Sequence, residues 1–213
     1  MSSYNLERLN QSNWMIGAEA FSTIRDQILC NGDPERILEF GSGESTRAFS
    51  CLFPHAQIES YDHDPRWMVQ FQHGEGNNVR VCVDQLRRRV IDGLLCETYA
   101  GTPAPAAFDV VLVDGPPGTT PNGRLGALLL GYRALRVGGL MFLDDARRPS
   151  ELRTIADFVE RTRTDLTFIQ AGHGVAMFRK KEEGIGPTPK SLVLQTAASF
   201  GQQRLKQALR RRR

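Results

Sequence analysis

Acidic residues stand at or just after the ends of five short apolar runs of this sequence. They are Glu39, Asp62, Asp84, Asp114 and the pair Asp144 and Asp145. Carboxylates can accept hydrogen bonds from sugar hydroxyls, pair with a cation, bind a hard metal ion or take up a proton. If the ends of these runs meet in the folded chain, they would form a site for a ligand that carries cationic and hydroxyl groups.

The first acid opens a glycine-rich turn, Glu39-Phe40-Gly41-Ser42-Gly43-Glu44-Ser45-Thr46. Gly41 and Gly43 permit a tight turn and the close approach of a ligand to the backbone. The dinucleotide-binding fingerprint would need a further glycine at position 46, where this chain has Thr. Glu39 also suits the ammonium group of an amino acid better than a pyrophosphate. The turn therefore argues against NAD, and a plain strand-to-helix turn is the alternative.

Two further acids have the spacing of nucleoside contacts. Asp62 lies roughly 20 residues beyond Gly41, where an acid accepts hydrogen bonds from ribose hydroxyls in nucleotide-binding α/β sheets. His63 follows it and would touch the adenosine. Asp84, after the third apolar run, is either a partner of an adenine amino group or the N-cap of a helix.

Strand-like and helix-like segments alternate along the chain. We predict helices over 14–30, 44–53, 65–73, 85–99, 124–136 and 150–163, and strands over 36–40, 56–62, 79–83, 108–113, 140–143, 166–170 and 175–179. This alternation favours right-handed βαβ units, in a mostly parallel sheet with helices on both faces and a closing antiparallel hairpin. Ligands of such sheets bind outside the carboxyl ends of the strands, where the acids would meet.

Four motifs in this order resemble the class I S-adenosylmethionine-dependent methyltransferases. They are E-F-G-S-G at 39–43, Asp62, FDVVLVDGPPG at 108–118 and GGLMFLDDARRP at 138–149, within a likeness that covers about residues 34–180. The chain is most similar to small bacterial methyltransferase-like proteins whose substrates are unassigned. The resemblance implies a Rossmann-like, doubly wound seven-stranded sheet in the order 3-2-1-4-5-7-6, with strand 7 antiparallel. It also implies S-adenosylmethionine as cofactor, held by Glu39, Gly41, Ser42, Gly43, Ser45, Asp62, His63, Asp84 and Asp114.

The acids after the fourth and fifth strands are the predicted catalytic groups. Methyl transfer is an in-line displacement on a sulfonium, so the enzyme must position the acceptor and remove its proton. We assign this work to Asp114 and Asp145. The chain also resembles metal-dependent O-methyltransferases, in which an acid and an Asp-Asn pair at these places bind Mg²⁺. Here Ala146 replaces the Asn, so Asp144 would join Asp114 and Asp145 as the third ligand; without a metal, the paired carboxylates would provide a general base.

Arginines near these acids suggest an acceptor class. Arg124 and Arg147, with Arg148, could hold an anionic acceptor such as a carboxylate-bearing sugar. A distant likeness to plant methyltransferases that act on sugar acids of cell-wall polymers points the same way. The alternative is that these arginines are solvated on helix surfaces.

The charge is unevenly distributed. The chain has 27 Lys and Arg against 24 Asp and Glu, a net of +3, but no carboxylate occurs from Gly184 onward. The cationic residues of that segment are Lys190, Arg204, Lys206 and Arg210 to Arg213. We therefore divide the chain into an acidic methyltransferase domain with an N-terminal helical lead-in, residues 1–183, and a linker with a basic C-terminal helix or tail, residues 184–213.

The sequence is compatible with several roles for the basic tail. It would pack on the body as a helix, or dock on a membrane surface or a partner protein. The acidic body makes nucleic acid an unlikely occupant of the cleft, and the oligomeric state is open.

The composition indicates in which cellular compartment the protein is expected. No run approaches the roughly 20 apolar residues of a membrane span, and the opening residues lack a signal-peptide pattern. The cysteines Cys30, Cys51, Cys82 and Cys96 have no C-x-x-C spacing. We expect reduced core or near-core thiols in a cytoplasmic protein.

These patterns together predict a methyltransferase that acts on an oxygen of a small-molecule or glycan acceptor. The alternatives are a non-catalytic adenosyl-binding scaffold and an RNA-directed methyltransferase that uses the basic tail.

Overall fold

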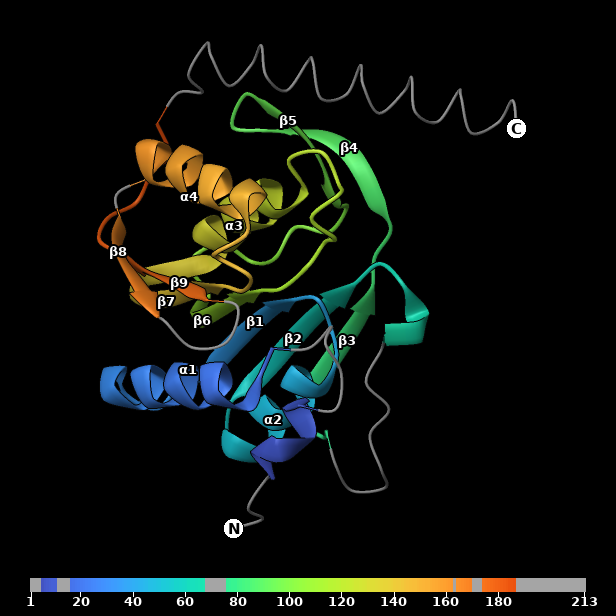
Figure 1. Cartoon of the computed structure of the whole chain (residues 1–213), viewed down its shortest axis with the longest axis vertical. Coiled ribbons are helices and arrows are strands. Elements are labelled where there is room, and N and C mark those ends of the chain that lie inside the picture. The colour runs from blue at the N-terminus through green and yellow to red at the C-terminus, as the bar shows by residue number, and fades with distance from the viewer. Residues whose placement is uncertain (1–4, 11–15, 68–75, 163, 170–173, 187–213) are drawn as a thin grey trace.

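The fold is built on one large mixed sheet, seen in a computed structural model that describes residues 5–10, 16–67, 76–162, 164–169 and 174–186. The seven strands lie in the order β3-β2-β1-β6-β7-β9-β8 (Figure 1). Their bounds are β1 Arg36–Phe40, β2 Gln57–Asp62, β3 Val79–Val83, β6 Phe108–Val113, β7 Leu135–Leu143, β8 Thr164–Ile169 and β9 Val175–Lys180. Counted within this sheet alone, the order is the predicted 3-2-1-4-5-7-6. Strands β3, β2, β1, β6 and β7 are parallel, and β9 is antiparallel to both β7 and β8.

Helices cover both faces of the sheet, as Figure 1 shows. The helices are η1 Leu6–Asn10, α1 Ala18–Asn31, α2 Glu44–Leu52, η2 Pro65–Trp67, α3 Gly123–Ala134 and α4 Pro149–Arg161. One apolar cluster joins α1 and α2 to the sheet, through residues such as Phe21 and Phe49. The other joins α3 and α4 to the opposite face, through residues such as Leu128 and Phe158.

Strand β6, at the centre of the sheet, is buried on both faces. All six of its residues are buried, and alternate side chains enter the two clusters, Val110 and Leu112 on one face, Val111 and Val113 on the other. A parallel strand covered on both faces needs a continuous apolar run. Strands at this position can therefore be recognised from the sequence alone.

The predicted helix over 85–99 is wrong, because this segment is a β-hairpin. Strands β4 Leu86–Ile91 and β5 Leu94–Tyr99 pair antiparallel outside the main sheet, and β5 packs against α3. The turn between them is Asp92-Gly93, and both residues have positive φ, 50° and 78°. A two-residue turn of this kind matches the twist of the flanking strands, and Asp-Gly is among its preferred sequences.

Two boundaries also differ from the prediction. Helix α3 ends at Ala134 rather than Arg136, and β7 starts at Leu135 rather than Leu140. The cause is an irregularity in β7: Leu135 pairs with Phe108, and the register shifts before Leu140 pairs with Val110. Gly138 and Gly139 lie inside this strand.

Other predictions are only partly covered. The helix predicted from Pro65 to residue 73 begins as η2, and residues 68–75 lie outside the described part of the chain, as do 187–213 of the tail. The four cysteines are free, but only Cys96 is buried and Cys30 is exposed, so Cys30 is not a core thiol. Among the described residues, no helix is both long and apolar enough to cross a membrane.

Candidate active site

The glycine-rich turn after β1 lies against the loop after β6. Gly41 has a φ of 104°, and its N–H donates to the Tyr61 carbonyl at 2.8 Å. A Cβ at this position would lie 2.8 Å from the Gly115 nitrogen, so no side chain fits between the two loops. A Cβ at Gly43, by contrast, would meet nothing within 4 Å. The turn therefore closes on the β6 loop at Gly41 and leaves open space beside Gly43.

Asp62, the predicted ribose acid, holds this turn at the end of β2. Its Oδ2 accepts the Ser42 N–H at 2.9 Å and its Oδ1 accepts the Asp64 N–H at 2.8 Å. The His63 Nδ1 lies 3.3 Å from Oδ1, so His63 stands beside the acid as expected. Burial raises the pKa of Asp62, against the opposing effect of these backbone donors. A carboxylate has about four acceptor positions, so Asp62 can still accept from a ligand.

Glu39 has an internal role in this structure. Its side chain is completely buried, and it accepts hydrogen bonds from the hydroxyls of Ser45 at 2.5 Å, Ser60 at 2.8 Å and Thr46. Burial raises the pKa of Glu39 to about 7. Glu39 and Ser45 thus tie the start of α2 to the sheet, and this placement argues against a direct contact of Glu39 with an ammonium group.

Asp84 lies where the chain leaves β3. Its Oδ2 accepts the Gly101 N–H at 2.5 Å, which fastens the segment after the hairpin to the end of β3. The alternative role as a helix N-cap is wrong, because β4 follows instead of a helix. The contact of Asp84 with the adenine amino group stays a prediction.

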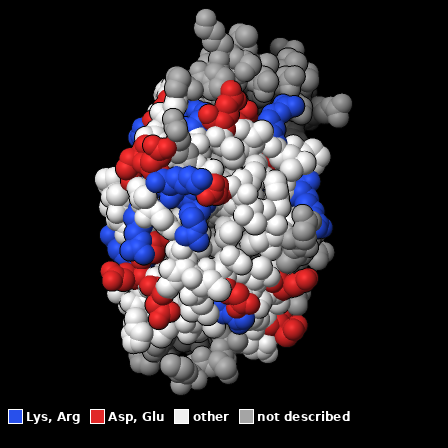
Figure 2. All heavy atoms as spheres, turned by 90° about the vertical axis from the view of Figure 1, so that its left-hand side faces the viewer, with Lys and Arg blue, Asp and Glu red and all other residues white. Residues whose placement is uncertain are grey.

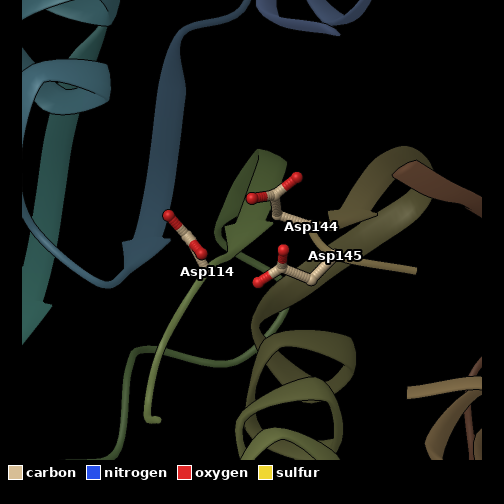
Figure 3. Close-up of side chains that lie close together, drawn as sticks. All are labelled: Asp114, Asp144 and Asp145. Carbon is tan, nitrogen blue, oxygen red and sulfur yellow. The ribbon is translucent and has the colours of Figure 1, made fainter. Parts of the chain in front are cut away.

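Three carboxylates meet beyond β6 and β7. Figure 3 shows Asp114 at the end of β6, with Asp144 and Asp145 at the end of the neighbouring β7. One oxygen of each lies within 4.8 Å of the others. Asp145 has a φ of 60°, a left-handed conformation that Asp adopts more readily than most residues. The sequence prediction that these three acids converge is confirmed.

Their proximity changes their acidity. Burial and then the neighbouring Asp144 raise the pKa of Asp114 well above its ordinary value. Burial and then Asp145 raise the pKa of Asp144 to about 6. The cluster therefore contains carboxyl groups that can hold or take up a proton near neutral pH.

Arg124 lies inside this cluster, so the alternative that it is solvated on a helix surface is wrong. The guanidinium donates to the carbonyls of Pro116 at 3.2 Å, Asp144 at 2.9 Å and Asp114 at 2.8 Å. It also approaches the carboxylates of Asp145 at 3.2 Å and Asp114 at 3.4 Å, and only 5% of its side chain is exposed. Arg124 therefore joins the β6 and β7 loops from α3, and its donors are used within the protein.

Arg147 and Arg148 also differ from each other. Arg147 is exposed, and a Cβ at Gly174 would meet its Cγ at 2.7 Å, so its stem lies against Gly174. Arg148 pairs with the Asp145 Oδ2 at 2.7 Å while 48% of its side chain stays exposed. Arg148 thus combines exposure with a contact to the acids.

Two buried residues that the sequence reasoning did not select border the site. Glu151, at the start of α4, is 2% exposed, and it contributes to a raised pKa of Arg124. Tyr99, from the hairpin, is fully buried, and its hydroxyl has no hydrogen-bond partner among the described residues. The Asp-Gly turn signal would have revealed the hairpin and hence the placement of Tyr99 on a strand.

Acidic and basic side chains intermingle on the face drawn in Figure 2, where neither sign forms a broad single patch. This face gives no surface of the kind that would track a nucleic-acid backbone.

Comparison with known proteins identifies the fold. No protein-family model matches the chain, and no curated protein does. Among solved structures, a methyltransferase from Geobacter sulfurreducens superposes with a TM-score of 0.52 at 13% identity, over 83% of this chain and 85% of that one. A caffeoyl-CoA O-methyltransferase candidate from Staphylococcus aureus superposes with a TM-score of 0.54 at 14% identity, over 75% and 82%. The structure of SAH-bound Podospora anserina methyltransferase PaMTH1 aligns with a TM-score of 0.46 at 19% identity, over 76% of each chain. The chain has the class I, Rossmann-like methyltransferase fold.

Proposed function

We propose that this protein is an S-adenosylmethionine-dependent methyltransferase that acts on an oxygen of a small-molecule or glycan acceptor. One observation carries the proposal. In a methyltransferase fold, Asp62, Asp84 and the cluster of Asp114, Asp144 and Asp145 gather at the carboxyl ends of the strands, next to the turn at Gly41. In open α/β sheets this edge is where ligands bind.

The residues at this edge suit an adenosyl sulfonium. Asp62 would accept hydrogen bonds from the ribose hydroxyls, and Asp84 would accept one from the adenine amino group. The open space beside Gly43 would let the ligand approach the backbone of the turn. When bound, the cofactor supplies the methyl group. The surrounding carboxylates lower the energy of a cation at this place.

The acid cluster would receive the proton that the acceptor hydroxyl loses. Asp114 and Asp144 fit this role better than Asp145, because Asp145 pairs with two arginines, Arg124 at 3.2 Å and Arg148 at 2.7 Å, whereas Asp114 lies 3.4 Å from Arg124. A side chain positioned to take up a proton in this way accelerates a reaction by roughly 10²–10⁴-fold.

The same carboxylates suit a divalent cation in their chemistry. Hard cations take carboxylate oxygens together with water, and Asp114, Asp144 and Asp145 supply three such groups. Ala146 is buried and supplies no ligand atom. Metal binding and proton uptake are thus two uses of one cluster, and chelation separates them: activity that survives EDTA leaves only proton uptake, whereas activity restored by Mg²⁺ assigns a metal.

Arg124 bears on the acceptor. The Arg124 guanidinium is not placed to bind an anionic acceptor, because its donors are used by acids and carbonyls of the protein. A neutral hydroxyl-bearing acceptor therefore suits the interior of the site better than a carboxylate-bearing sugar.

The test of the proposal is calorimetric titration with S-adenosylmethionine and S-adenosylhomocysteine. Binding of both, with methyl transfer to a hydroxyl-bearing acceptor, supports it. No binding of either at millimolar concentration would rule out the enzyme, and binding without any transfer would leave an adenosyl-binding scaffold.

Asp62→Ala should weaken binding of S-adenosylhomocysteine by roughly 10–100-fold, the scale of hydrogen bonds to a charged group. Asp64→Ala is the matched control, because the Asp64 carboxylate is engaged by Arg66, pairing with its guanidinium and accepting its backbone N–H. Equal affinities of the two variants would show that Asp62 is not the ribose contact.

A further inference from the structure

Tyr99 is a buried polar residue that neither the packing nor the roles assigned above explain. Its side chain is fully buried, and its hydroxyl has no hydrogen-bond partner within the described part of the chain. Other buried tyrosine hydroxyls of the protein are satisfied: that of Tyr132 donates to the Glu182 carbonyl at 2.6 Å. Buried hydroxyls nearly always have a partner, so an unpaired one points to a group that is absent from the protein itself.

The ring of Tyr99 is held firmly. It stacks on Phe40 with a centroid distance of 5.3 Å and an interplanar angle of 26°, and the ring of Tyr61 lies 6.4 Å away. Arg89 holds the backbone on the C-terminal side of the ring, since its Nη1 donates to the carbonyls of Tyr99, Ala100 and Gly101 at 2.7–3.0 Å. The hydroxyl is therefore aimed by two neighbouring strands and by the hairpin, and it is not free to turn away.

The hydroxyl is aimed at the two glycine loops of the proposed cofactor site. A Cβ on Gly115 would collide with the Tyr99 hydroxyl and would lie 3.1 Å from the Gly41 Cα. The hydroxyl thus reaches the place where the β1 turn meets the β6 loop. The carboxylates of Asp62 and Asp114 are also near enough to raise its pKa, in addition to burial.

We propose that Tyr99 is a further binding residue of the adenosyl cofactor, whose hydroxyl donates a hydrogen bond to an acceptor atom of the bound ligand. The inference rests on the proposed function. Gly115 and Gly41 carry no side chain that would stand between the hydroxyl and a ligand at the glycine-rich turn. The hairpin that stands in place of the expected helix would then have a function, because it delivers this residue.

The experiment compares Tyr99→Phe with the wild-type protein in two measurements. Titration with S-adenosylhomocysteine gives the affinity, and thermal unfolding without ligand gives the stability of the free protein. Phe keeps the ring and its stacking, and removes only the hydroxyl. We expect the affinity to fall by about tenfold, on the scale of one hydrogen bond, while the melting temperature of the free protein stays the same or rises.

Tyr132→Phe is the matched control, because its hydroxyl already has a partner far from the glycine loops. It should lower the melting temperature of the free protein and leave the affinity unchanged.

One outcome overturns the inference while the proposed function stands: a Tyr99→Phe variant that binds S-adenosylhomocysteine as tightly as the wild type. If the melting temperature of that variant is also lowered, the hydroxyl is assigned to a structural contact such as a trapped water. If the wild-type protein itself fails to bind, the proposed function fails first, and the inference fails with it.

Discussion

Arg124 illustrates how a single residue changes meaning once its surroundings are known. In the sequence it is a cation beside a cluster of acids, which suggests an anchor for an anionic substrate. In the structure its guanidinium bonds the carbonyls of Pro116, Asp114 and Asp144, and it neutralises part of the charge of the acid cluster. The planar guanidinium has five donors and can bond several carbonyls and carboxylates at once, which the compact ammonium of Lys cannot do.

Arg124→Met should therefore destabilise the protein by about 3–5 kcal/mol, the usual cost of leaving buried charges without a partner. Arg147→Met removes a neighbouring but exposed guanidinium and should cost less than about 1 kcal/mol. Urea unfolding of both variants measures the difference. Similar losses in the two variants would contradict the internal role of Arg124.

Glu39 gives a pH dependence whose sign follows from its burial. Its pKa rises from 4.5 to about 7 in the folded protein, so between these values the native state holds a proton that the unfolded state releases. The contribution of Glu39 is fully present below its unfolded pKa and is lost as the pH rises through about 7, at up to about 1.4 kcal/mol per pH unit.

Glu39→Gln should remove this part of the slope. Stability of the two proteins is measured by urea unfolding at several pH values, and the difference between them isolates Glu39, since the other buried acids are common to both. Stability curves that stay parallel between about pH 5 and 7 would show that Glu39 is not protonated in this range.

At the scale of elements, the β4–β5 hairpin supplies residues that lie next to the candidate active site. It occupies the place where the alternating pattern predicts a helix, and it contributes Tyr99 and the segment that Asp84 and Arg89 hold. The hairpin depends on the Asp92-Gly93 turn, where both residues are left-handed. Side chains with a branched Cβ rarely adopt this conformation.

Gly93→Val should destabilise the protein by roughly 1–3 kcal/mol, because Val is strained at this φ. Gly93→Asn is the control, since Asn tolerates the left-handed region and should cost less. Thermal and urea unfolding report the difference. If the two variants are equally stable, the turn does not control the stability of the hairpin.

At the scale of the whole molecule, the sheet and its two helical layers form the proposed catalytic body, and the basic residues of the tail follow it. Within the described residues, Ile185 packs against the core under α3 and α4, and the Gly186 N–H donates to the Arg161 carbonyl at 2.7 Å. The docking of the tail on a membrane surface or a partner protein stays a prediction.

Removal of residues 187–213 should leave binding of S-adenosylhomocysteine unchanged within about twofold, because the strand ends that form the candidate site all belong to the described body. Titration of the truncated and full-length proteins checks this, with circular dichroism to confirm folding. A folded truncated protein that no longer binds would place part of the cofactor site in the tail.

The sequence by itself determined most of the strands and the edge of the sheet at which the acids meet, whereas the strand order was implied by the resemblance to the methyltransferases. Buried parallel strands are continuous apolar runs, and the residue after each run lies at the same edge, so both features can be read locally. The convergence of Asp114, Asp144 and Asp145 followed from this rule.

Only the tertiary structure decided what each polar group does there. Glu39 bonds to hydroxyls of α2 and β2, Arg124 spans the loops that follow β6 and β7, and the Tyr99 hydroxyl lies beside glycines of the loops after β1 and β6. Burial and hydrogen-bond partners depend on segments that are far apart in the chain, and no local spacing encodes them. That is the physical reason why the site could be located from the sequence, whereas the roles of its residues required the fold.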